Sequence, residues 1–158
     1  MTNPPSALCL PRVAAASRQH LIDAFWAFST KTHKQKESER LQQIKSGVSA
    51  ELVAATRSTF NLEDDHLALL FNASPATLRR RLHQQKPLDS VASERLDRIT
   101  SVCLQAEAVF ESRAEAAHWM SKSNAALGHG TPVLLCLTEI GANQVRRVLH
   151  ALESGGAA

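Results

Sequence analysis

The sequence predicts an all-α protein, and three observations support this fold class. Tyrosine is absent and aromatic residues make up only 4% of the 158 residues, a composition that favours helices over sheets. Apolar residues recur at helical spacing in several segments, and no segment alternates convincingly as a strand. Residues that favour the start of a helix stand in pairs, most clearly Ser74 with Pro75 and Thr131 with Pro132.

Residues 1–45 predict an N-terminal extension, partly disordered and with a possible helix. Residues 1–17 are rich in proline, serine and alanine, and we expect them to be poorly ordered. A helix over about 18–45 would carry a short apolar stripe of Leu21, Ile22, Phe25 and Phe28. Its polar part, 31–40, fits either a solvated helix or a linker. The N-terminus lacks a basic cluster followed by an apolar stretch, so we do not expect a secretion signal.

Residues 46–88 have the pattern of a helix-turn-helix. After a helix over about 49–60, Asn61 can cap a second helix that begins at position 62. Asn72 ends that helix, because asparagine tolerates the left-handed conformation of a tight turn. Ser74 as N-cap and a following proline then open a third helix, which extends to about position 85. Leu78 and Leu82, one turn apart, are its predicted buried residues.

The outer face of this third helix is basic, which predicts DNA binding in a major groove. Arginine and threonine near its start can reach base edges, while flanking arginines and the helix N-terminus hold phosphates. A basic, solvated helix in an ordinary bundle is the alternative, and the turn signature favours DNA binding. The expected DNA-binding residues are Ser74, Ala76, Thr77, Arg79, Arg80, Arg81, His83 and Gln84.

Charge and cysteine usage narrow the function classes. Residues 1–88 contain twelve Lys/Arg against seven Asp/Glu, and residues 89–158 contain six against eight. The basic half is expected to bind a polyanion, and the mildly acidic half is expected to have a different function. Three widely spaced cysteines without a C-x-x-C pair argue against a disulfide framework or zinc site and favour a reducing cytosol. The apolar runs are too short to span a bilayer.

Residues 89–158 predict a second helical domain after a short connector. A long helix over about 90–111, with Val91 in its apolar stripe, would be a central spar or half of a dimer interface. Shorter helices are expected over 113–120, 131–139 and from 140 or 141 to 153. The last of these would bury Val145, Val148, Leu149 and Leu152. Between them, Asn124 and two glycines flanking His129 predict a loop that is held in shape for a partner.

A series of spaced residues in this half is distinctive. In order, they are Leu88-Asp89, Ala92-Ser93-Glu94-Arg95-Leu96, Ala106, Val109-Phe110, Ala116, Trp119, Asn124-x-Ala126-Leu127-Gly128, Thr131-Pro132, Leu134-Leu135, Thr138-Glu139 and Gly141-Ala142. This series resembles the Xre/MbcA/ParS antitoxin family over about residues 47–155, with an Xre-like helix-turn-helix followed by a toxin-binding domain. The chain departs from the family pattern at Ser123, where proline is common, and at His129, where glycine is common.

The resemblance implies a type II antitoxin encoded beside a RES-class toxin, which has an ADP-ribosyltransferase-like fold and degrades NAD or transfers its ADP-ribose. It implies that the C-terminal domain covers the toxin's active site, while the N-terminal domain dimerises and represses the shared operon. The implied partners are a RES-type toxin, operator DNA and a second copy, without a cofactor or membrane, in the bacterial cytoplasm. By position, the implied toxin-binding residues are Trp119, Asn124, Leu127, Gly128, Thr131, Pro132, Gly141 and Arg146.

Two other function classes fit parts of the sequence. Seven histidines, with Cys136 and Glu139 close in sequence to His129, suggest an enzyme. However, H-E-x-x-H, G-x-S-x-G and a phosphate loop are all absent, so we expect a protein that is not an enzyme. The alternative that stays open is a plain helix-turn-helix regulator whose C-terminal domain dimerises or senses a ligand. The implied toxin contacts also have structural explanations, since Trp119 could anchor the core and Asn124 could cap a helix.

Overall fold

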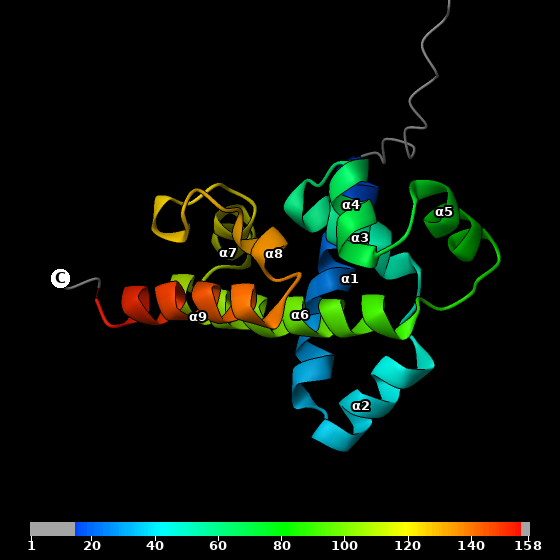
Figure 1. The fold of residues 1–158 in the computed structure, drawn as a ribbon, viewed down its shortest axis with the longest axis horizontal. Helices are drawn as coiled ribbons and strands as arrows, with labels where there is room; N and C mark the ends of the chain where they lie inside the picture. The colour runs from blue at the N-terminus through cyan, green and yellow to red at the C-terminus, as the bar shows by residue number, and fades with distance from the viewer. Residues whose placement is uncertain (1–14, 156–158) are drawn as a thin grey trace, which may run out of the picture.

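The computed structural model describes residues 15–155 and is all-α over that range, as predicted. Residues 15–17, which were expected to be poorly ordered, begin a helix, and the rest of that prediction, for residues 1–14, lies outside the described residues. Within 15–155 there is one isolated β-bridge, between Asn124 and Gly130, and no strand. The helices are α1 (Ala15–Lys34), α2 (Glu37–Ser46), α3 (Glu51–Phe60), α4 (Asp64–Phe71), α5 (Pro75–His83), α6 (Ser90–Phe110), α7 (Arg113–Met120), the 3-10 helix η1 (Ala125–Leu127), α8 (Pro132–Leu135) and α9 (Glu139–Glu153) (Figure 1).

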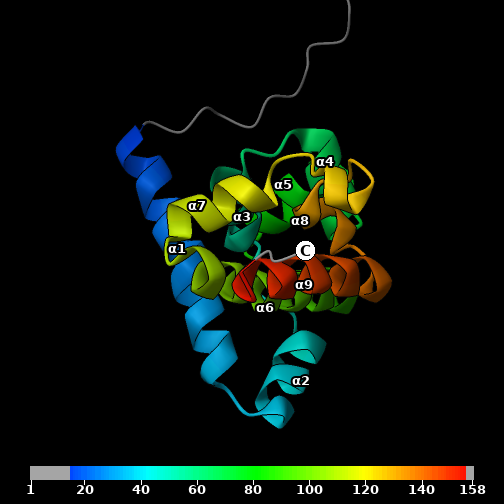
Figure 2. The same cartoon turned by 90° about the vertical axis from the view of Figure 1, so that its left-hand side faces the viewer.

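The long helix α6 is the spar around which the other helices pack (Figures 1 and 2). Its N-cap Asp89 accepts a hydrogen bond from the Ala92 backbone N–H at 2.8 Å. Helices α1, α2, α4, α7 and α9 all contact it. Val91 is 45% exposed, so its predicted burial is wrong. It lies about 100° around the helix from the buried Ala92, at the edge of the buried face.

The core is a single cluster that runs from α1 to α9. Helix α1 contributes Phe25 and Trp26, both fully buried, and the Phe25 ring meets those of Trp26 and Phe60 edge-on at 5.6 and 5.1 Å. The helices on both sides of residues 88/89 share this cluster. Because one core joins these helices, packing does not mark a boundary at residue 45 or at residue 88, and both domain limits stay predictions.

The first half of the chain differs from the prediction at two helix ends. The predicted helix over 18–45 is two helices, α1 and α2, which are separated at Gln35 and Lys36. The Lys36 backbone N–H donates to the Glu39 carboxylate at 2.8 Å, which closes the start of α2. Asn61 was predicted to open the next helix, and this is wrong: it ends α3 in a left-handed conformation, with φ 52°, and α4 begins at Asp64. Asparagine suits either position, so the residue type alone could not decide.

Helix α9 runs parallel to α6, because α7, η1 and α8 carry the chain back to the middle of α6, where Glu139 meets Arg98 (Figure 1). Arg98 pairs with Glu139, and seven residues further along both helices Gln105 donates to the Arg146 carbonyl. Continuing this pairing along both helices places the last residue of α6, Phe110, opposite residue 151 of α9. Leu152 is 42% exposed, so its predicted burial is wrong, since it extends past the end of α6. None of the helices in residues 15–155 has a stretch long and apolar enough to cross a membrane.

Candidate functional site

The turn between α4 and α5 has the local geometry that the sequence predicts. Asn72 adopts the left-handed conformation with φ 49°, and the Ala73 N–H donates to the Ala68 carbonyl at 3.2 Å. The Ser74 hydroxyl accepts a hydrogen bond from the Thr77 backbone N–H at 3.2 Å, and Pro75 is the first residue of α5. These bonds set the angle at which α5 leaves α4, as a helix-turn-helix requires.

Helix α5 presents most of its predicted DNA-binding residues to solvent. Ala76, Arg80, His83 and Gln84 are exposed, and Ser74 is exposed at the N-cap, while Thr77, Arg79 and Arg81 are half-buried. Within residues 15–155, the arginines at 79, 80 and 81 form no salt bridge, so no carboxylate competes with an anionic ligand. The Arg81 guanidinium donates to the Pro87 carbonyl at 2.8 Å and holds the loop that follows α5.

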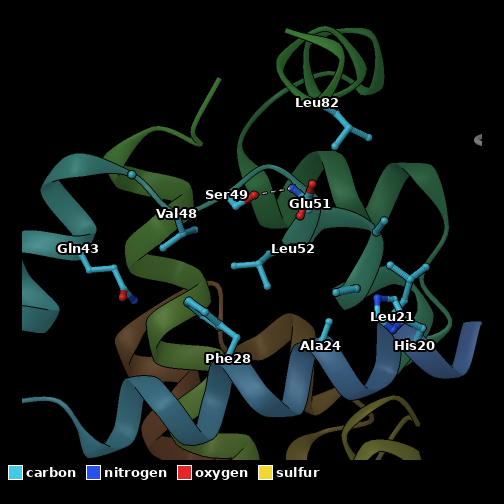
Figure 3. A pocket seen from close by; sticks show the side chains of 13 residues that line it. His20, Leu21, Ala24, Phe28, Gln43, Val48, Ser49, Glu51, Leu52 and Leu82 are labelled. Carbon is cyan, nitrogen blue, oxygen red and sulfur yellow. Dashed lines mark hydrogen bonds between the residues drawn. The ribbon is translucent and has the colours of Figure 1, made fainter. Parts of the chain in front are cut away.

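The second half of α5 stands away from the rest of the protein. Leu82 was predicted to be buried, and this is wrong: it is 38% exposed and faces a hollow of about 670 Å³ (Figure 3). The hollow lies between α5 and the α1–α3 pair, with Leu21, Phe28 and Leu52 in its lining. Only Leu78 of α5 is fully buried. The helix is therefore anchored at its beginning and open beneath its end.

The loop between α7 and α8 is closed by its own hydrogen bonds. Asn124 caps η1, its side chain accepting from the Ala126 N–H at 2.9 Å, and its backbone N–H donates to the Gly130 carbonyl at 3.1 Å. Gly128 and His129 both have positive φ, at 62° and 66°. Ser123 donates its hydroxyl proton to the His129 carbonyl at 2.8 Å. The two positions that depart from the family pattern thus contact each other and close the loop.

The implied toxin-binding residues differ in how far they reach the surface. Trp119, Leu127 and Thr131 are half-buried, and the Trp119 ring lies 5.7 Å from that of Phe110. Pro132 and Gly141 are buried. At Gly141 a Cβ atom would lie 1.9 Å from the Leu135 carbonyl oxygen, so this glycine permits the contact between α8 and α9. Pro132 and Gly141 shape the surface and present no side chain to a partner.

Beside the loop, a hollow of about 440 Å³ lies between η1 and the outer face of α9. The sequence places Leu127, Gly128 and the last helix from Gly141 in the toxin-binding set, but of that helix it singles out Gly141 and Arg146, not the residues that complete the lining. These residues are Gln144, Arg147, Val148 and Ala151. The spacing of 140, 144, 147 and 151 places them on one helix face, and this was the available signal. Ile140, 78% exposed, begins that face.

The two neighbouring arginines of α9 have different surroundings. The Arg146 guanidinium donates to Glu139 at 2.7 Å and to Asn143 at 2.8 Å, so it is engaged within its own helix. Arg147 is exposed, lines the hollow and forms no salt bridge within the described residues. The Arg147 side chain is therefore the freer of the two for a partner, although Arg146 was the one predicted.

A charged cluster holds the beginning of α9 against α6. Arg98 pairs with Glu94 at 2.5 Å and with Glu139 at 3.2 Å, and it donates to the Cys136 carbonyl at 2.9 Å.

The thiols of Cys103 and Cys136 are free and buried beneath this corner. Burial raises the pKa of both thiols, that of Cys136 to about 12. Within residues 15–155, no group of three or more His, Cys, Asp or Glu side chains could hold a metal ion.

Comparison with known proteins gives two adjoining family matches and a curated relative. Residues 39–101 match the antitoxin Xre-like helix-turn-helix domain, and residues 105–155 match the antitoxin Xre/MbcA/ParS C-terminal toxin-binding domain. The relative is an Antitoxin Xre of Pseudomonas putida, 33% identical over 79 residues, which are 50% of this chain and 50% of the relative. The match thus spans about half the length of that relative. The first domain match contains α4 and α5, and the second contains the η1–α9 hollow.

Proposed function

The chain belongs to the Xre/MbcA/ParS family of type II antitoxins, and we propose that it neutralises a RES-type toxin and represses its own operon. The toxin would consume NAD or transfer its ADP-ribose to a target. The antitoxin acts without catalysis, by covering the toxin's active site in the bacterial cytoplasm. A homodimer and a larger toxin–antitoxin complex are part of this proposal.

The observation that carries the toxin-binding proposal is the outer face of α9 beside the η1 hollow. This face combines exposed Ile140, Gln144 and Arg147 with a concave surface, within the segment that matches a toxin-binding domain. Interfaces of this kind depend on a few apolar or arginine anchors surrounded by weaker contacts. We assign Ile140 and Leu127 as apolar anchors and Arg147 as the charged one. Asn124 and Gly128 maintain the loop that completes the surface.

The repression proposal depends on α5. Its solvent face carries Arg79 and Arg80 with no carboxylate in salt-bridge distance in the described chain, and its N-terminus is free to approach a phosphate. In a dimer, two copies of α5 would enter major grooves about 34 Å apart on a palindromic operator.

The two activities are tested by separating them. The chain is co-expressed with the RES-type toxin encoded beside it, and growth, cellular NAD, co-purification and operator binding are measured. Arg80→Ala should weaken operator binding by about 1–3 kcal/mol, roughly 5- to 150-fold, while rescue from the toxin persists. Arg147→Glu should weaken toxin binding and leave operator binding unchanged. The pair is matched because both arginines are exposed on helices and neither forms a salt bridge in residues 15–155.

Each arm can fail by itself. If repression survives Arg80→Ala intact, α5 is not the recognition helix. If the full chain is stably expressed but neither binds the toxin nor restores NAD, the better account is a plain helix-turn-helix regulator whose C-terminal domain has another partner.

A further inference from the structure

We propose that the toxin-binding surface continues beyond the C-terminal domain onto α4, so that the toxin contacts the helix-turn-helix domain itself. The surface that we call the bridging face begins at Ile140 in α9, already assigned as an anchor, and adds Val91 in α6 and Leu69 in α4. The inference rests on the proposed function, and it identifies a part of the partner surface that neither domain match assigns.

The bridging face combines three exposed apolar side chains with the charged residues that link them, Arg95, Arg98 and Glu139. Leu69 is 58% exposed, Val91 45% and Ile140 78%. They are three of the six large apolar side chains that are exposed within residues 15–155. Single exposed apolar residues are ordinary, but several that gather in one place mark an interaction surface.

Helix α6 brings the three residues to one place. Val91, Arg95 and Arg98 follow one another at spacings of four and three residues, so they lie along one edge of α6. The Arg95 guanidinium donates to the Leu69 carbonyl at 2.8 Å, which fixes the end of α4 over this edge.

One turn further along the same edge, Arg98 pairs at 3.2 Å with Glu139, the residue before Ile140. Because α6 rises 1.5 Å per residue, the edge from Val91 to Arg98 is only about 10 Å long.

Continuity with the toxin-binding domain identifies the partner. Ile140 is also the first residue of the α9 face that includes Gln144 and Arg147 and borders the η1 hollow. That face, from 140 to 151, is about 16 Å long at 1.5 Å per residue. A standard interface covers about 800 Å² on each partner, which corresponds to a patch roughly 28 Å across. An interface of that size is longer than the α9 face, and one that extends past Ile140 along the edge of α6 reaches α4 as well.

The test measures the affinity of the full chain for the purified RES-type toxin, with a matched control. Leu69→Gln and Leu41→Gln replace two leucines that are both 58% exposed, and glutamine suits a helix about as well as leucine. Leu41 is in α2, which lies on the opposite side of α6 from α4 (Figures 1 and 2). We expect Leu69→Gln to weaken toxin binding about tenfold and Leu41→Gln to change it less than twofold. Val91→Gln provides a second, independent variant in α6 and should weaken binding in the same direction.

The outcomes separate this inference from the proposed function. If Ile140→Gln weakens toxin binding while Leu69→Gln and Val91→Gln bind like the unaltered chain, the surface ends at α9, and only this inference is overturned. If Leu69→Gln changes the oligomeric state of the free chain and leaves toxin affinity per protomer unchanged, the bridging face belongs to a second copy, and the inference is also overturned. If the unaltered chain binds no toxin, both proposals fail.

Discussion

Replacing Gly141 with alanine tests how tightly α8 and α9 pack at the corner beneath the toxin-binding surface. Gly141 is in the first turn of α9, and its backbone N–H donates to the Thr138 hydroxyl at 3.0 Å. A Cβ atom there would lie 1.9 Å from the Leu135 carbonyl oxygen and 2.8 Å from its carbonyl carbon. Ordinary van der Waals contact begins at 3.4 Å, so α9 would have to move by about 1.5 Å.

Two effects with opposite signs determine the result. Alanine in a helix is more stable than glycine by roughly 1 kcal/mol, which alone would stabilise the variant. Inserting a methyl group into a full site costs about 1–3 kcal/mol, and the neighbour here is backbone, which yields less readily than a side chain. With the cost at the upper end, the net loss of stability is about 2 kcal/mol, which corresponds to a fall in Tm of roughly 4–8 °C for a chain of this size.

The assay is thermal unfolding followed by circular dichroism, with Gln144→Ala as the control. Gln144 is exposed in the same helix, so its replacement should change the stability by less than about 0.5 kcal/mol. Toxin affinity should also fall for Gly141→Ala, because a shift of α9 displaces the neighbouring Ile140. An unchanged or raised Tm for Gly141→Ala would mean that helix propensity dominates and that the close contact with Leu135 is not rigid.

Three further measurements test other parts of the structure. Ser74→Ala should lower the free energy of unfolding, measured with urea, by about 0.5–2 kcal/mol. Thr131→Ala should lower it less, because the Thr131 side chain makes no cap hydrogen bond, and equal losses would contradict the assigned cap at Ser74. With its pKa raised to about 12, Cys136 has a thiolate fraction of about 10⁻⁴ at pH 8, so mass spectrometry should find it unmodified after brief alkylation of the native chain. The stability that this neutral thiol contributes is complete below about pH 9 and is lost as the pH rises towards about 12, so the Tm should fall over that range. Arg40→Lys should lower stability by about 1–2 kcal/mol, because lysine cannot replace the paired bonds of 3.0 and 2.7 Å to Asp97, and an unchanged urea midpoint would show that the pair is not stabilising.

The features that could be predicted from the sequence depend on interactions within a few residues. The N-cap Ser74, the proline after it and the left-handed Asn72 are each visible in the order of the residues, because caps and turns are local. The long helix over 90–111 and the helix over 113–120 were predictable from their period. The family could also be identified, because its distinctive residues occur in order along the chain.

The burial of individual residues could not be predicted in the same way. Leu82, Val91 and Leu152 all fit an apolar stripe, yet all three are exposed. Leu82 faces an open hollow, Val91 lies at the edge of the buried face of α6, and Leu152 extends past the end of α6. Arg146 and Arg147 are adjacent in sequence, but only the fold shows that Glu139 engages the first and leaves the second at the hollow.

The sequence by itself determined the fold class, the helix-turn-helix and the family, because these depend on composition, caps and the order of residues. Tertiary structure alone decided that α1 belongs to the core and that one edge of α6 holds the end of α4 through Arg95 and the beginning of α9 through Arg98. The physical reason is the distance along the sequence between the residues that interact. A cap or a turn involves neighbours three or four residues away, whereas burial and shared surfaces require segments that are distant in sequence to meet in space.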